Sequence, residues 1–301
     1  MPEVLRLFVT LLLACVSCAG AETALSFSSD HDLLDVYTAD QIGKISRSSM
    51  TVTEDGITAA FVGERGAVIV KAALDGDILQ TTLLAGTVLS SFYETLVCAD
   101  GSVWFESLPK SLGNNSPAGG TATLENYDRD GKLLRSTKLF AWYHLVAANK
   151  DTIFLLDGEL VYLGFVRKSR FFEQGKVRLT NPIKGGIGIA GKDTHLLIIE
   201  RPTGNMTIVD GAQQRSSQFG LDQPHIVYAV AENGNQVYLL SGDNVFETDR
   251  GGHVLQSYWL RSGHRFVGRS IGVTSGRIYV MDRAGRMEIF PLRPGARNSE
   301  R

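Results

Sequence analysis

Short apolar runs alternate with polar turns along most of the chain. Six of the turns lie between two strand-like runs and are made of Gly, Asp, Asn, Lys and Ser. They recur at a spacing of about 40–50 residues, which is typical of a β-propeller with one four-stranded blade per repeat. The six turns are Asp55-Gly56, Asp100-Gly101, Lys150-Asp151, Lys192-Asp193, Asn233-Gly234 and Ser275-Gly276.

The second repeat shows the predicted unit. Its four strands are expected at residues 95–99, 102–106, 121–127 and 132–139, with a long loop between the second and the third. Asp-Gly pairs favour the hairpin turns because Gly takes a positive φ at no steric cost. The other repeats are placed at residues 50–84, 144–179, 186–221, 226–260 and 270–292.

The last repeat is one strand short, and a strand-like segment at residues 24–45 precedes the first repeat. That segment includes Leu33-Leu34-Asp35-Val36-Tyr37. An open ring would expose unpaired N–H and C=O groups, so we expect this segment to complete the sixth blade. The prediction is an all-β, six-bladed β-propeller with four-stranded antiparallel blades, closed by an N-terminal strand.

Residues 1–21 have the pattern of a secretory signal peptide. Arg6 precedes an apolar run at residues 7–16, and Ala19-Gly20-Ala21 forms a cleavage site before Glu22. The run is too short to span a bilayer, which needs roughly 20 apolar residues. We therefore predict a secreted or periplasmic protein without a transmembrane segment, with a propeller at residues 22–293 and a disordered tail at 294–301. The alternative is a lipoprotein anchored through Cys15, because Leu12-Leu13-Ala14-Cys15 loosely resembles a bacterial lipobox.

Charge and cysteine content narrow the possible partners. The formal net charge is −2, and the basic residues are dispersed, which argues against nucleic acid binding. Cys98 is the one cysteine that follows the signal segment, so no intramolecular disulfide is expected, and its apolar surroundings predict a buried, inert thiol. We expect a monomer.

An acidic residue ends the second strand of every repeat. One interpretation is a ring of carboxylates on one face. The other, which we favour, is that each acid bonds to backbone amides in the following turn. The six acids are Glu64, Glu106, Asp157, Glu200, Asp243 and Asp282.

The last two repeats resemble NHL-type repeats. Residues 276–290 read GRIYVMDRAGRMEIF, and residues 249–255 read DRGGHVL; both are similar to that motif. The resemblance implies a six-bladed propeller of the NHL or TolB-like type. Enzymes, scaffolds and binding proteins share such repeats, so the resemblance does not decide the function.

The sequence lacks the residues that several kinds of metal-binding and catalytic site require. Metal-dependent lactonases of this architecture hold Ca²⁺ with oxygen ligands near the channel, and Glu94 is the one acid in the segments that precede the innermost strands. No histidine pair has a zinc-binding spacing, and no catalytic Ser or phosphate-loop motif is present. We predict no metal and no cofactor.

Large rings recur in the segments before the innermost strands. There they could form a binding surface at one mouth of the channel, or they could wedge between blades. His144 and His225 occupy equivalent positions and could face one another across the channel or pack between blades. We predict an exported, non-catalytic module that binds a protein or a small ligand at this mouth; the alternative is a metal-dependent lactonase- or esterase-like hydrolase or lyase. The predicted site comprises Phe92, Tyr93, Trp142, Tyr143, His144 and His225.

Overall fold

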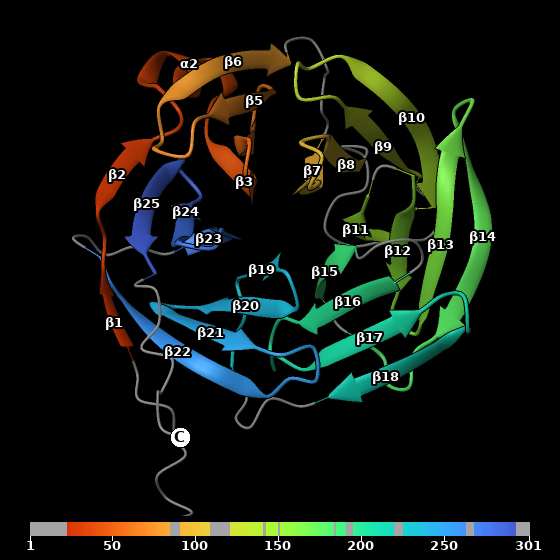
Figure 1. The fold of residues 1–301 in the computed structure, drawn as a ribbon. Coiled ribbons are helices and arrows are strands. Elements are labelled where there is room, and N and C mark those ends of the chain that lie inside the picture. Colours follow the sequence, from red (N-terminus) through yellow and green to blue (C-terminus); the bar gives the residue numbers. More distant parts are fainter. Residues whose placement is uncertain are drawn as a thin grey trace, which may run out of the picture.

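Six sheets surround a central axis as the blades of a propeller (Figure 1). The computed structural model describes residues 23–84, 91–108, 121–140, 143–149, 151–183, 185–190, 195–219, 225–262 and 268–292. Within these ranges five sheets have four strands and one has five. The predicted fold class, an all-β six-bladed propeller, is confirmed.

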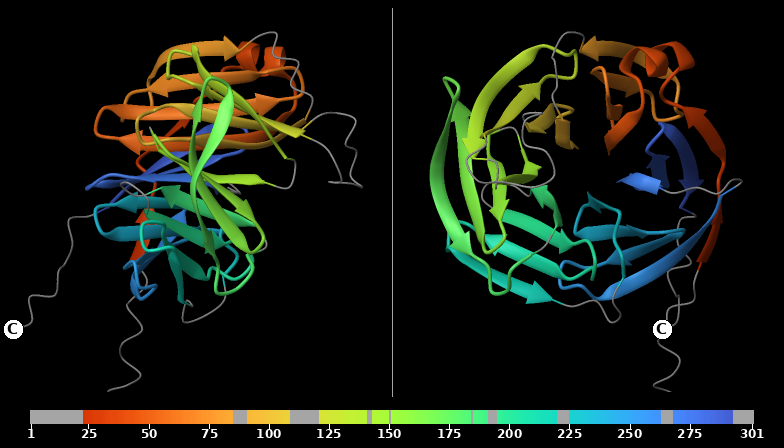
Figure 2. Two further views of the ribbon diagram at one scale, coloured as in Figure 1. Left: turned by 90° about the vertical axis from the view of Figure 1, so that its right-hand side faces the viewer. Right: turned by 180° about the vertical axis from the view of Figure 1, so that it is seen from behind.

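Each blade runs from an innermost strand beside the axis to an outer strand at the rim (Figure 2). Blade one has β3 (Ile45–Thr53), β4 (Gly56–Gly63), β5 (Ala67–Ala72) and β6 (Ile78–Leu84), and blade two has β7 (Ser91–Val97), β8 (Val103–Leu108), β9 (Thr121–Tyr127) and β10 (Leu133–Phe140). Blade three has β11 (His144–Ala148), β12 (Ile153–Asp157), β13 (Leu160–Arg167) and β14 (Arg170–Arg178), and blade four has β15 (Gly186–Ala190), β16 (His195–Glu200), β17 (Met206–Asp210) and β18 (Arg215–Phe219). Blade five has β19 (Ala229–Asn233), β20 (Gln236–Ser241), β21 (Asn244–Thr248) and β22 (Val254–Arg261), and blade six has β23 (Gly268–Val273), β24 (Arg277–Asp282) and β25 (Arg286–Pro291).

The repeating turns link the innermost strand of a blade to its second strand. Gly56, Gly101 and Gly234 have φ values of 133°, 79° and 64°. Such positive values are strained for residues with a Cβ atom. At Asp100 the side-chain Oδ1 also accepts a hydrogen bond from the amide of Ser102 at 3.0 Å. Local turn chemistry therefore accounts for the regular hairpins.

The N-terminal segment closes the ring, as predicted. β2 (Ser29–Asp32) pairs antiparallel with β25 and becomes the fourth strand of blade six. Before it, β1 (Thr23–Ser26) pairs parallel with β22 and adds a fifth strand to blade five, which was not predicted. Figure 1 shows β1 and β2 along the outer edges of two neighbouring blades. The first strands of the chain thus connect blades five and six.

The predicted strand at Leu33–Tyr37 is wrong. Leu33 and Leu34 are buried, and the chain then forms the short helix α2 (Val36–Ile42). Asp35 is its N-cap and accepts a hydrogen bond from the Thr38 amide at 2.8 Å. A carboxylate that satisfies a free helical N–H stabilises a helix start, and this outweighs the strand propensity of the segment. In the described part of the chain, no helix is both long and apolar enough to cross a membrane.

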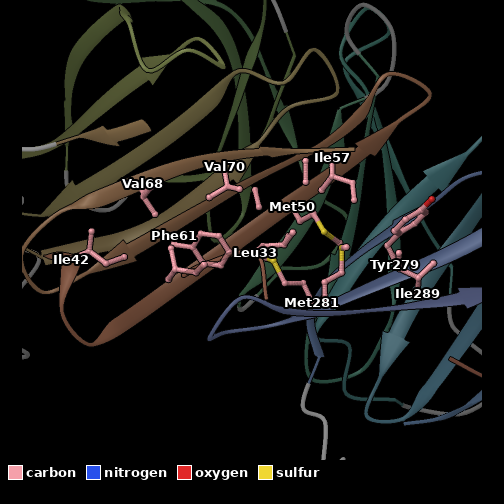
Figure 3. Close-up of a cluster of buried hydrophobic side chains, with 14 residues drawn as sticks. Leu33, Ile42, Met50, Ile57, Phe61, Val68, Val70, Tyr279, Met281 and Ile289 are labelled. Atoms are coloured by element: carbon pink, nitrogen blue, oxygen red, sulfur yellow. The ribbon is translucent and has the colours of Figure 1, made fainter. Parts of the chain in front are cut away.

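The hydrophobic core lies between neighbouring blades. One cluster, shown in Figure 3, joins Met50 and Phe61 of blade one to Tyr279 and Met281 of blade six, with Leu33 between them. All five side chains are buried. Similar clusters join the other neighbouring blades and hold the innermost strands around the axis.

Candidate ligand site in the central channel

A cavity of about 430 Å³ lies on the axis of the propeller. All six innermost strands line it, together with Arg201 from the turn after β16. The lining residues are 48–52, 94–100, 145–149, 186–190, 228–232, 270–273 and Arg201.

Glycines allow the innermost strands to approach one another. A Cβ atom on Gly188 would lie 2.8 Å from the carbonyl oxygen of Val146, and one on Gly272 would lie 2.2 Å from the Val52 side chain. Both distances are too short for real contacts, so these positions require glycine. The glycine-rich run around β15 therefore serves close packing near the axis.

One mouth of the cavity carries a charged pair. We call it the strand-start mouth, because Ser48, Glu94 and Leu145 lie there near the beginnings of their innermost strands. Arg201 and Glu94 form an ion pair with 3.5 Å between Nη2 and Oε2, and their side chains are 47% and 29% exposed. The pair links blade two to blade four, and Arg201 is its more exposed partner.

Both partners are held in place by backbone bonds. The amide of Arg201 donates to the carbonyl oxygen of Gly185 at 3.1 Å, and its own carbonyl accepts from the amide of Val227 at 2.9 Å. Glu94 lies within β7, and its Oε1 accepts from the amide of Thr95 at 3.3 Å. Burial raises the pKa of Glu94, while the charges of Arg201 and Arg47 act in the opposite direction.

Glu106 lies directly opposite Glu94 in the register of β7 and β8. Its side chain is 1% exposed. Oε2 accepts a hydrogen bond from the amide of Leu145 at 3.2 Å, and among the described residues Oε1 has no hydrogen-bond partner. Burial, with a smaller contribution from the charge of Glu94, raises the pKa of Glu106 to about 8. Burial therefore favours the protonated form of Glu106.

His144 adjoins this buried acid. Its Nδ1 lies 3.9 Å from Oε1 of Glu106, which is too long for a hydrogen bond, and its side chain is 40% exposed. Burial lowers the pKa of His144, against the charge of Asp157. The two groups meet between blades two and three, beside the strand-start mouth.

The predicted aromatic site is only partly described. The side chains of Phe92 and Tyr93 and the whole of Trp142 lie outside the described part of the chain. Tyr143 packs edge-on against Tyr162 at 4.8 Å, in a groove of about 700 Å³ between the outer strands of blades two and three.

The two predicted histidines do not line the axial cavity. The ring of His225 lies 4.4 Å from that of Phe246, whereas His144 adjoins Glu106. Tyr143, His144 and His225 are not among the residues that line the axial cavity. Whether the six residues form one recognition surface stays a prediction.

The acids that end the second strands have mixed roles. Oδ1 of Asp282 accepts from the amide of Arg286 at 3.0 Å, and Oε2 of Glu200 accepts from the hydroxyl of Thr203 at 2.7 Å. These two serve their own turns. Glu106 instead bonds to the next blade. Sequence analysis missed Arg201, although its position directly after a strand-end acid was a usable signal.

The described residues contain no group of three or more His, Cys, Asp and Glu that could hold a metal ion. Cys98 lines the cavity but is buried, and burial raises the pKa of its thiol to about 12. It is therefore an unreactive thiol at neutral pH. At the opposite end of the cavity, Glu232 pairs with Arg250.

Solved structures share the fold. Virginiamycin B lyase from Staphylococcus aureus is 14% identical, with a TM-score of 0.55 over 88% of this chain and 98% of that one. A chain of a mitotic checkpoint complex is 12% identical, with a TM-score of 0.55 over 88% of this chain and 94% of that one. The Pan2 WD40 domain of Neurospora crassa is 10% identical, with a TM-score of 0.51 over 83% and 89%. At these identities the likeness concerns the fold alone.

No family model matches the chain, and no curated protein sequence matches it. The similarity to NHL-type repeats therefore stays a prediction from the residues.

Proposed function

We propose that this protein is an exported binding module that holds a small ligand in the axial cavity and does not catalyse its conversion. The observation that carries the proposal is the cavity itself, which all six blades line. Its volume of about 430 Å³ falls within the range of about 300–1,000 Å³ for small-molecule pockets. Its walls are strands whose faces are buried against neighbouring blades, so the site is preformed.

The fold alone does not choose between binding and catalysis. Its structural neighbours include a lyase and a WD40 domain. The polar groups around the strand-start mouth favour binding, because the open pair of Glu94 and Arg201 can exchange partners with a ligand. A protein partner at the predicted aromatic site, including Phe92 and Trp142, is compatible with the same module.

A wider side chain in the cavity tests the proposal. Purified protein is dialysed against a small-molecule extract of its source, and retained molecules are identified by native mass spectrometry. Val230→Trp and Thr51→Trp each place a large ring in the lining and should abolish retention. Val254→Trp, at a 37% exposed position on β22 of the same blade as Val230, is the control.

We expect wild type and Val254→Trp to retain the same molecule, with similar melting temperatures for the variants that fold. If Val230→Trp fails to fold, Thr51→Trp decides. Retention by all variants, or by none including wild type, contradicts the proposal. A stoichiometric divalent metal that the cavity variants lose would instead support the alternative, a metal-dependent hydrolase or lyase.

A further inference from the structure

We propose that the ligand carries an anionic group, a carboxylate or a phosphate, which pairs with Arg201 at the strand-start mouth. The inference rests on the proposed function and adds the chemical class of the ligand. It starts from the balance of charges around Glu94.

Two guanidinium groups act on one carboxylate at this mouth. Arg201 pairs with Glu94 from blade four, and the charge of Arg47, on β3 of blade one, also acts on Glu94. Glu106, which lies opposite Glu94 in the strand register, is buried, and burial favours its protonated form.

The guanidinium of Arg201 has N–H groups that could donate hydrogen bonds to a ligand. Among the described residues its side chain has one ion pair, at 3.5 Å. A charge-assisted hydrogen bond measures about 2.7–2.9 Å, so the pair with Glu94 is loose. The guanidinium has five N–H donors in a planar fork that fits a carboxylate or phosphate with two parallel bonds. An anion could therefore bind more closely than Glu94 does.

The position of Arg201 also suits a binding group. Its main chain is bonded to Gly185 and to Val227, so the side chain projects from a fixed point. Its side chain is 47% exposed and lines the cavity. Glu200 adjoins Arg201 in the chain, and its Oε2 is turned toward its own turn, where it accepts a hydrogen bond from the Thr203 hydroxyl at 2.7 Å. A ligand cation would instead face two arginines.

The test compares small charged probes at constant ionic strength in isothermal titration calorimetry. The probes are malonate and inorganic phosphate as anions and choline as the cation. Arg201→Gln should weaken binding of the preferred anion by about tenfold or more, since it removes a charged hydrogen-bond donor. Glu94→Gln should strengthen it, because the competing carboxylate is gone.

Arg215→Gln is the matched control. Arg215 is exposed at the start of the outer strand β18 of the same blade, so its loss should change nothing. Melting temperatures check that each variant is folded. Tighter binding of malonate would indicate a carboxylate on the ligand, and tighter binding of phosphate would indicate a phosphate group.

Three outcomes overturn the inference. They are anion binding that survives Arg201→Gln, choline binding that Glu94→Gln abolishes, and no binding of any anion probe. Each of them leaves the proposed function standing if the extract experiment still finds a molecule that the cavity variants lose. If that experiment fails as well, both proposals fall.

Discussion

The sequence pattern places Glu106 at the end of the second strand of its blade, but the residue lies inside β8, two residues before its end, and its carboxyl group is buried. Its Oε2 accepts a hydrogen bond from the amide of Leu145, in blade three, and its Oε1 lies 3.9 Å from Nδ1 of His144. Burial without a compensating cation favours the neutral form of an acid. At the residue scale, the fold thus buries an acid that the sequence pattern placed in a turn, and burial favours its protonated form.

This gives a pH dependence of stability. Burial raises the pKa of Glu106 from 4.5 to about 8 on folding. Between these values the folded state holds more protons than the unfolded state, so the free energy of unfolding falls as the pH rises through this window. The expected slope is on the order of 1 kcal/mol per pH unit, and it should level off above about pH 8.

Glu106→Gln should reduce this fall, since its amide stays uncharged at every pH. The measurement is urea denaturation at several pH values between 5 and 9. Glu173→Gln, at an exposed position on β14, is the control and should follow wild type. Curves for wild type and Glu106→Gln that run parallel over the whole range would show that Glu106 releases its proton normally.

At the element scale, the N-terminal strands depend on a turn of the first blade. His31 of β2 lies against the Asp75-Gly76 turn, and a Cβ on Gly76 would be 2.3 Å from Cγ of His31. The φ of Gly76 is 99°, so the turn also needs glycine for its backbone. A turn that the sequence marks as a local hairpin therefore also seats the closing strand.

Gly76→Ala should destabilise the protein more than Gly234→Ala does. Both positions have a positive φ, but a Cβ on Gly234 meets nothing within 4 Å. The difference therefore measures the displacement of His31 and β2, and overpacking of this kind costs about 1–3 kcal/mol. Chemical denaturation of the two variants decides the question. Equal losses of stability would mean that β2 adjusts freely to the added methyl group.

At the scale of the whole molecule, the ring is held by pairing between the two ends of the described chain. Arg286 of β25 bonds to Asp30 of β2 at 2.7 Å, and the two residues are 256 positions apart. The last blade is therefore complete only when both ends have been brought together. β1 extends the connection to blade five.

The processing prediction concerns this same end. Cleavage after Ala21 would leave Glu22 as the first residue, directly before β1, so that the first strand of the mature protein could pair at once with β22. Intact mass and N-terminal sequencing of the exported protein should give residues 22–301. A chain that begins at a lipid-modified Cys15 would support the lipoprotein alternative, and a chain that retains residues 1–21 would contradict cleavage.

The repeat of strand-like runs and Gly-containing turns was sufficient to predict the blades, their number and the missing strand. Strand alternation and the positive φ of residues such as Gly101 depend on only a few neighbouring residues, so they can be predicted from the sequence. The strand-end acids were recognised in the same way.

Only the tertiary structure decided the rest, because it depends on contacts between blades. Helix α2 replaced a predicted strand once Leu33 and Leu34 were buried and Asp35 capped the following turn. The pairing of Glu94 with Arg201 joins blades two and four, and no local pattern predicts which charges meet across an axis. Burial and pKa are properties of the packed molecule, whereas strand and turn are properties of short segments, and this is the physical reason for the division.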